Sequence, residues 1–239
     1  MYSRKRRGNM LIEAQMKGIK GENKILTIYR LFAIVLMLLI FTGNVFAGED
    51  DQPKKLSDYQ SLLKRVMSFD RTVDFKALRL SYAETQDYNP YGDDKAKKAE
   101  MFEALRNKQY EKAVSSAQAI LEKKFVDIEA HFVSSIAFRE MKNAGRYNFH
   151  HFVTGGLIDS ILDSGDGKTP ETAFVIIETG EEYALLGIIG FEVVRQSLIK
   201  SNGHSYDKME TKHRKTGETA IFFFNVDIPF NWLNKQFKK

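Results

Sequence analysis

The sequence predicts an α+β fold, in which helical hairpins come first and pack against a small, mainly antiparallel C-terminal β-sheet. In residues 57–163 apolar side chains recur every three or four positions, which is the spacing of amphipathic helices. Residues 191–201 and 204–213 flank Asn202 and Gly203, a strong signal for a hairpin turn between two strands. Helices followed by strands are typical of the α+β class.

The basic charge of the chain is concentrated at its beginning. The 239 residues include 36 Lys and Arg and 31 Asp and Glu. Residues 1–47 contain eight of these bases and two of these acids, which leaves 28 bases and 29 acids in residues 48–239. Because phosphate binding requires basic residues concentrated on the folded part, we expect no nucleic-acid partner.

Residues 1–47 are predicted to be a signal peptide. A basic stretch precedes the apolar run Leu31–Phe41, and small residues follow, with cleavage expected after Ala47. The run is shorter than the roughly 20 apolar residues that a membrane-spanning helix needs. We therefore expect an exported protein, periplasmic or extracellular; the alternative is an anchor formed by an uncleaved segment 31–46, which would be its only membrane contact. The initiator stays open among Met1, Met10 and Met16.

Composition divides the rest of the chain. Residues 48–55 are charged and polar and form a predicted linker, residues 56–164 a helical region, and residues 165–239 an α+β sheet region. We expect residues 56–239 to form one compact unit. The absence of cysteine excludes a disulfide scaffold, a thiolate metal site and a lipid anchor on a cysteine.

Capping residues predict where the helices of the helical region begin. The predicted N-caps are Ser57 (a capping box with Gln60), Asp74, Asp94 and Asp127, and a later helix is expected over Tyr147–Leu162. Alternating helices with short connections resemble the tetratricopeptide hairpin, over at most one and a half repeats. Because a free solenoid needs about three repeats, we expect these helices to pack against the sheet.

The sheet region combines strands with one short helix. Ala173–Ile177 is predicted to be a continuous buried strand, and Thr179 with Glu182 makes a capping box for a helix that ends at Gly190. After the hairpin, Thr219–Ile228 is predicted to be a strand covered on both faces.

The segment Gly165–Thr169 is similar to the end of a phosphate-binding loop, but the spacing fails. Both a phosphate-binding loop and a calcium loop would need a different residue at the position of Leu162, which is neither a glycine nor an acid. We interpret the segment as a turn.

The histidines show no metal-binding spacing. Neither HxxxH nor HExxH occurs, so a zinc site would have to be assembled across separate elements. A dyad of His204 with Asp207 is disfavoured, because strand residues three apart point to opposite faces. We expect no cofactor and no bound metal.

Seven residues are candidates for a binding site, and no catalytic residue is predicted. They are Arg79, Tyr82, Tyr91, His150, His151, His204 and Tyr206. Arg79 lies on the apolar face of its predicted helix and allows two interpretations. In the first, its aliphatic stem packs in the core and its guanidinium group pairs with a carboxylate. In the second, it binds an anion in a cleft.

Several patches together resemble the bacterial family DUF4919 over residues 56–237. They are Leu78, Arg79 and Tyr82; Tyr88–Tyr91; Gly165–Lys168; Pro170–Ala173; Glu181–Tyr183; and Asn202–His204 with Tyr206 and Asp207. The resemblance implies exported bacterial proteins with no established reaction, cofactor or partner. It supports the architecture and assigns no catalytic residue.

Two functional hypotheses follow. The first is a non-catalytic binding module of the cell envelope, which would hold a protein, peptide or other envelope partner with its helical hairpins and Tyr-rich turn. The alternative is an envelope hydrolase or metal-dependent enzyme, with a site assembled from dispersed His, Tyr and Arg residues. Convergence of these side chains in one pocket would favour the enzyme.

Overall fold

The computed structural model describes residues 58–92 and 94–237. The predicted signal peptide, the linker and Ser57 lie outside these residues. The helical part comprises α3 (Asp58–Met67), α4 (Phe75–Tyr82), α5 (Lys95–Arg106), α6 (Tyr110–Leu121), α7 (Ile128–Glu140) and α8 (Ala144–Leu162). The C-terminal part comprises η1 (Pro170–Thr172), β1 (Phe174–Val175), α9 (Gly180–Ile188), β2 (Phe191–Ser201), β3 (His204–His213), β4 (Thr219–Asn225) and α10 (Asp227–Phe237).

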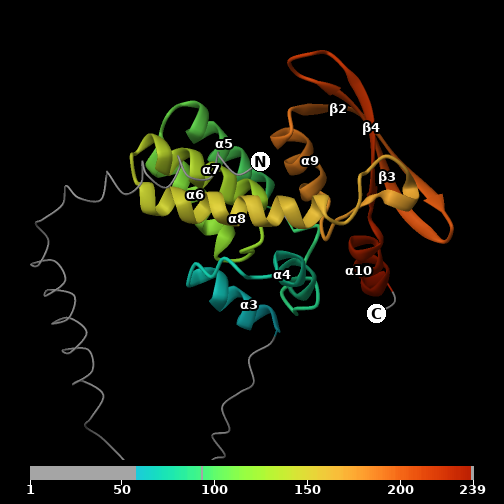
Figure 1. Cartoon of the computed structure of the whole chain (residues 1–239), viewed down its shortest axis with the longest axis horizontal. Coiled ribbons are helices and arrows are strands. Elements are labelled where there is room, and N and C mark those ends of the chain that lie inside the picture. Colours follow the sequence, from blue (N-terminus) through green and yellow to red (C-terminus); the bar gives the residue numbers. More distant parts are fainter. Residues whose placement is uncertain (1–57, 93, 238–239) are drawn as a thin grey trace, which may run out of the picture. The chain divides into compact units, whose positions relative to one another are not determined.

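The helices α5 to α8 pack in chain order, each against the next (Figure 1). Small residues on the facing sides allow close approach, and they are fully buried together with a few larger side chains: Met101, Ala104, Ala113, Ala117, Ile120, Ala130 and Val133. The carboxylates of Asp74 and Asp127 accept the backbone N–H of Ala77 and Ala130, each at 2.9 Å. Both predicted N-caps are thereby confirmed.

The sheet has the strand order β1-β4-β3-β2, and the α+β class is confirmed. The hairpin β2–β3 turns at Asn202 and Gly203, both of which have positive φ, as the sequence predicts. β3 pairs antiparallel with β4, whereas β1 pairs parallel with β4. The sheet is therefore mixed, and a bulge between Val193 and Arg195 interrupts its edge strand β2.

Five details differ from the sequence predictions. The expected strand Ala173–Ile177 is reduced to two paired residues, and β4 ends at Asn225 because Asp227 begins a helix that the sequence analysis missed. Thr179 makes no side-chain cap, since its own backbone is already helical (φ −63°, ψ −24°), and Glu182 is buried. Asp94 likewise makes no cap, and α8 already begins at Ala144.

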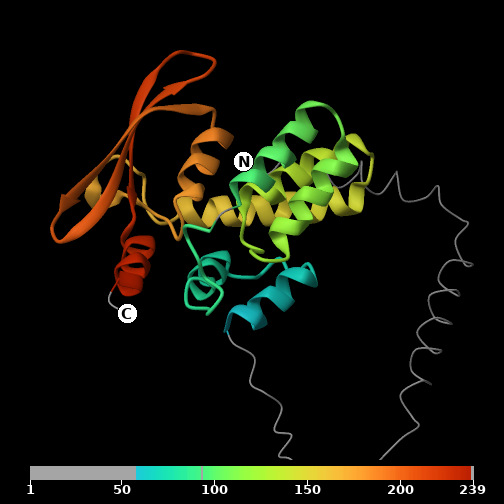
Figure 2. The same cartoon turned by 180° about the vertical axis from the view of Figure 1, so that it is seen from behind.

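One apolar core joins the helical part to the sheet. Fully buried side chains from both parts share it, among them Leu78, Leu157, Ile176, Leu185 and Phe224. α8 contacts both α7 and β1, and in both views it runs from the other helices toward the sheet (Figures 1 and 2). The described residues thus belong to one compact unit.

None of the helices in the described part combines the length and apolarity that crossing a membrane requires.

Candidate functional site

Two pockets that share lining residues lie between the helical part and α9, and we call them together the groove. The first, of about 480 Å³, lies between residues 90–98 and the start of α9. The second, of about 430 Å³, lies between α5 and α7 on one side and α9 and β2 on the other. Glu129 of α7 and Tyr183 of α9 line both pockets. We call the first the polar half of the groove and the second the apolar half.

The polar half is lined by five members of a network of two ammonium groups and four carboxyl groups, whose sixth member, Asp127, is buried beneath them: Lys98, Lys124, Asp94, Asp127, Glu129 and Glu178. Lys98 Nζ lies 2.9 Å from Asp127 Oδ2 and 2.7 Å from Glu129 Oε2. Lys124 Nζ lies 2.8 Å from Glu178 Oε2 and 3.1 Å from Asp127 Oδ2. The fully buried Asp127 thus bridges the two lysines, while it also caps α7.

Burial and unequal numbers of charges shape the electrostatics of this network. Burial raises the pKa of Glu178 to about 7, against the opposing effect of the Lys124 ammonium group. Burial lowers the pKa of Lys124, but the charges of Glu178 and Asp127 outweigh it and leave that pKa above its ordinary value. Four carboxyl groups against two ammonium groups give the network more acidic than basic groups.

The apolar half is lined mainly by aromatic and aliphatic side chains from four elements: Phe102, Phe132, Ile188, Phe191 and Val193. Glu192 and Arg214 stand among its lining residues as charged groups. A concave, largely apolar surface with a few polar groups is typical of ligand sites.

Behind the groove, a chain of side-chain hydrogen bonds connects α9 to the sheet. The Tyr183 hydroxyl donates to Gln196 Oε1 at 2.6 Å, and Gln196 Nε2 donates to Asp207 Oδ2 at 2.7 Å. Asp207 in turn contacts the carboxyl group of Glu182. Tyr183 is 46% exposed, so this chain runs from the groove into the interior.

The predicted tyrosines Tyr82 and Tyr91 belong to one row of aromatic rings. The ring centroids of Tyr82 and Tyr88 are 5.8 Å apart, and Trp232 lies 6.4 Å from Tyr88 and 6.1 Å from Tyr91. Tyr88 donates its hydroxyl hydrogen to the carbonyl of Ile177. Tyr82 is buried, whereas Tyr91 is 43% exposed and lines the polar half of the groove.

Arg79 is fully buried and pairs with Glu181. Its Nε and Nη2 donate to the two carboxylate oxygens at 2.8 and 2.6 Å, Nη1 donates to Ser160 Oγ, and Nη2 also donates to the carbonyl of Val175. Glu181 accepts the backbone N–H of Ile177 as well. The stem of Arg79 packs in the core while its head meets a carboxylate, which matches the first of the two interpretations given above.

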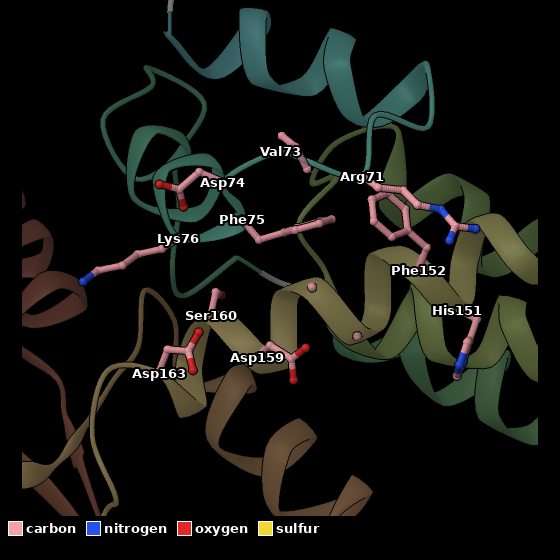
Figure 3. Close-up of a pocket in the computed structure, with 12 residues that line it drawn as sticks. Arg71, Val73, Asp74, Phe75, Lys76, His151, Phe152, Asp159, Ser160 and Asp163 are labelled. Atoms are coloured by element: carbon pink, nitrogen blue, oxygen red, sulfur yellow. The ribbon is translucent and has the colours of Figure 1, made fainter. Parts of the chain in front are cut away.

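His150 faces inward and His151 faces outward. His131 Nε2 donates to the carbonyl of Phe125, so its Nδ1 accepts from His150 Nδ1, which lies 3.0 Å away. Burial lowers the pKa of His131 to about 3 and that of His150 to about 4. His151 lines a separate pocket of about 620 Å³ over α8, together with Phe75, Phe152 and Asp159 (Figure 3).

His204 and Tyr206 lie at the far end of β3. His204 Nδ1 is 2.5 Å from Asp227 Oδ2 at the start of α10, and the rings of His204 and Tyr206 are 6.4 Å apart. Asp207 pairs with Leu198 and bonds Gln196, on the face opposite to Tyr206. The structure therefore separates His204 from Asp207, as the strand geometry predicts.

The structure does not bring the seven candidates into one pocket. Tyr91 lines the groove, His151 lines the pocket over α8, and Arg79 and His150 are engaged in the interior. Within residues 58–92 and 94–237, no group of three or more His, Asp or Glu side chains is placed to hold a metal ion.

Sequence reasoning missed most of the groove. The sequence analysis singled out none of Lys98, Lys124, Glu129 and Glu178, and it assigned Glu182 to a capping box. One usable signal was the position of Lys124, three residues before the N-cap Asp127, since this spacing places the two side chains together.

The comparisons with known proteins agree with the resemblance seen in the sequence. Neither a curated protein nor a solved structure matches the chain, so the likeness to a tetratricopeptide hairpin stays a prediction. The model of the family described as "Domain of unknown function (DUF4919)" matches residues 52–235. Since this match covers most of the 239 residues, the chain belongs to the DUF4919 family.

Proposed function

We propose that the protein is a non-catalytic binding module of the bacterial cell envelope, which holds an extended polypeptide segment in the groove beside α9. The observation that carries the proposal is the pair of pockets that share Glu129 and Tyr183. Because one pocket is polar and the other apolar, they suit a segment that presents a different side chain to each pocket.

The charges of the groove favour a basic side chain in the polar half. Four carboxyl groups surround two ammonium groups there, so an incoming cation meets excess negative charge. The exposed rings of Tyr91 and Tyr183 line the same half and offer faces for a cation–π contact.

The apolar half favours an aromatic or aliphatic side chain. Burial of such a side chain among Phe102, Phe132 and Phe191 contributes about 1.5–3 kcal/mol. The enzyme alternative has less support, because its His, Tyr and Arg residues occupy different parts of the described structure.

Export is a separate part of the proposal and rests on residues 1–47. Mass spectrometry of the protein recovered from its native cells tests it. A mature chain that begins at Gly48 in an envelope or extracellular fraction supports export, and a cytosolic chain that retains Leu31 to Ala47 contradicts it.

Peptide binding can be measured through Trp232, the single tryptophan of the chain, whose ring lies 6.1 Å from that of Tyr91. The probes are unstructured dodecapeptides with a Lys and a Phe, and matched peptides in which Glu replaces Lys or Ser replaces Phe. We expect saturable changes in emission with the Lys–Phe peptides and at least about tenfold weaker binding, or 1.4 kcal/mol, with either replacement.

Variants localise the site. Tyr183→Ala should weaken binding and Glu129→Gln should reduce the preference for Lys, because both residues line both halves. Tyr147→Ala, which removes a partly buried tyrosine outside the groove, and Glu111→Gln on the surface of α6 are the matched controls. Equal binding of all peptides, or equal effects of groove and control variants, would contradict the proposal.

A further inference from the structure

A buried pair of carboxyl groups lies behind the groove. Glu182 of α9 has no exposed surface, and within residues 58–92 and 94–237 neither of its side-chain oxygens meets an N–H or hydroxyl donor. What it contacts is the carboxyl group of Asp207 on β3, which is also buried. Two carboxylates in such contact would repel strongly in a dry interior, whereas one proton between them makes an O–H···O⁻ hydrogen bond.

Among the residues that the structure describes, no positively charged group acts on either member of the pair. The charged groups that act on Glu182 are Asp207 from β3 and Glu181 from its own helix. Tyr91, from the segment before α5, and Tyr183 are the titratable groups nearby, and both have a raised pKa, chiefly because of burial and also because of this pair. Glu181 is committed to Arg79, so a proton is the neutralising partner that remains among the described residues.

Hydrogen bonds connect the pair to a residue that lines the groove. Asp207 accepts from Gln196 of β2, and Gln196 accepts from Tyr183, the side chain that lines both halves of the groove. Tyr183 follows Glu182 directly in α9, so both the backbone and the hydrogen-bond chain fix its position.

We propose that Glu182 and Asp207 share one proton, and that this pair joins α9 to the sheet and positions Tyr183 as a wall of the groove. Loss of the proton at alkaline pH leaves two buried negative charges between α9 and β3. The side chain of Tyr183 is then no longer held in place. The inference does not depend on which ligand the groove holds, since it concerns the protein alone.

The sign of the pH effect follows from the protons bound. Burial, and then the charge of Asp207, raises the pKa of Glu182 from 4.5 to about 9. Between these values the folded chain keeps a proton that the unfolded chain has lost. The folding equilibrium constant therefore falls about tenfold per pH unit in this window on account of Glu182. Glu182→Gln removes this dependence while its amide still donates to Asp207.

The test compares wild type with Glu182→Gln by urea unfolding from pH 6.5 to 8.5, without ligand. We expect the ratio of the two folding constants, wild type over variant, to fall about 100-fold across this range. Parallel pH profiles would overturn the shared proton. Direct titration of the Glu182 carboxyl carbon by NMR in wild type is independent of how the variant folds; titration near pH 4.5 would overturn the proposal as well.

The positioning of Tyr183 has its own readout. The ring signal of Tyr183, assigned by Tyr183→Phe in protein with ¹³C-labelled tyrosine, should shift above pH 9 in wild type but not in Glu182→Gln. In Gln196→Leu the folding equilibrium constant should fall with pH as it does in wild type, because the carboxyl pair is intact. The ring signal of Tyr183 should change less with pH than in wild type. An unchanged Tyr183 signal in wild type would overturn the positioning role, and peptide binding could still succeed or fail separately.

Discussion

The buried ion pair of Arg79 and Glu181 allows a quantitative prediction. Arg79→Met keeps a long, apolar side chain in the core but removes the guanidinium group. Glu181 then remains buried with the backbone N–H of Ile177 as its one described donor. We expect the free energy of unfolding at pH 7 to fall by about 4 kcal/mol, because removing one partner of a buried pair costs about 3–5 kcal/mol.

The contacts of Arg79 support this magnitude. Its guanidinium group makes two charge-assisted hydrogen bonds to Glu181, at 2.8 and 2.6 Å, and donates at 3.1 Å each to Ser160 and the carbonyl of Val175. Since a domain is usually stable by about 5–15 kcal/mol, the variant loses a large part of its total stability. The double variant Arg79→Met/Glu181→Met should lose much less, because no unpaired charge is left in the core.

Urea unfolding followed by Trp232 fluorescence gives the free energies for the four proteins of this double-mutant cycle. The reasoning predicts that the two single variants lose more together than the double variant loses. A loss below about 1 kcal/mol for Arg79→Met, or additive losses in the cycle, would refute it, since the pair would then behave like an exposed surface ion pair.

Two further predictions concern α8 and its neighbours. Gly155→Ala should stabilise the protein by about 0.5–1 kcal/mol, because no described atom lies within 4 Å of the added Cβ atom. Gly156→Ala should destabilise it, because the added Cβ atom would lie 2.2 Å from the ring of Phe75. Thermal unfolding of both variants tests whether the two changes in stability have opposite signs. The lowered pKa values of His131 and His150 mean that the unfolded chain binds more protons below about pH 6.5, so their contribution to stability is complete above that pH and is lost as the pH falls toward 4. His150→Phe should therefore lose less stability than wild type between pH 7 and 5 in urea unfolding, and equal losses would contradict this assignment.

The sequence was sufficient for those elements whose signals are local. The N-caps Asp74 and Asp127 and the turn at Asn202 and Gly203 depend on residues a few positions apart, and the structure confirms them. The parallel pairing of β1 with β4 joins residues about 50 positions apart, so no local pattern predicts it. The sequence analysis missed the helix α10 because Asp227 follows the apolar strand β4 almost directly, so that the predicted strand was extended to Ile228.

The candidate site could be predicted only in small part. Tyr91 was among the seven candidate binding residues, but its neighbours in the polar half come from α5, α7 and the start of α9. Whether Lys124 is a solvated charge or part of a buried network depends on Glu178, 54 residues later in the chain. Glu182 fits a capping box by spacing, yet burial against Asp207 determines its actual environment.

The distance along the chain between Arg79 and its partner affects the order in which the protein folds. The two residues are 102 positions apart, and the core around them combines side chains from α4, α8, β1 and α9. In a chain that ends with α8, the guanidinium group of Arg79 lacks its carboxylate partner and lies on a surface that is buried in the complete protein. We therefore expect the core around Arg79 to form its native contacts late in folding and together, once α9 is available.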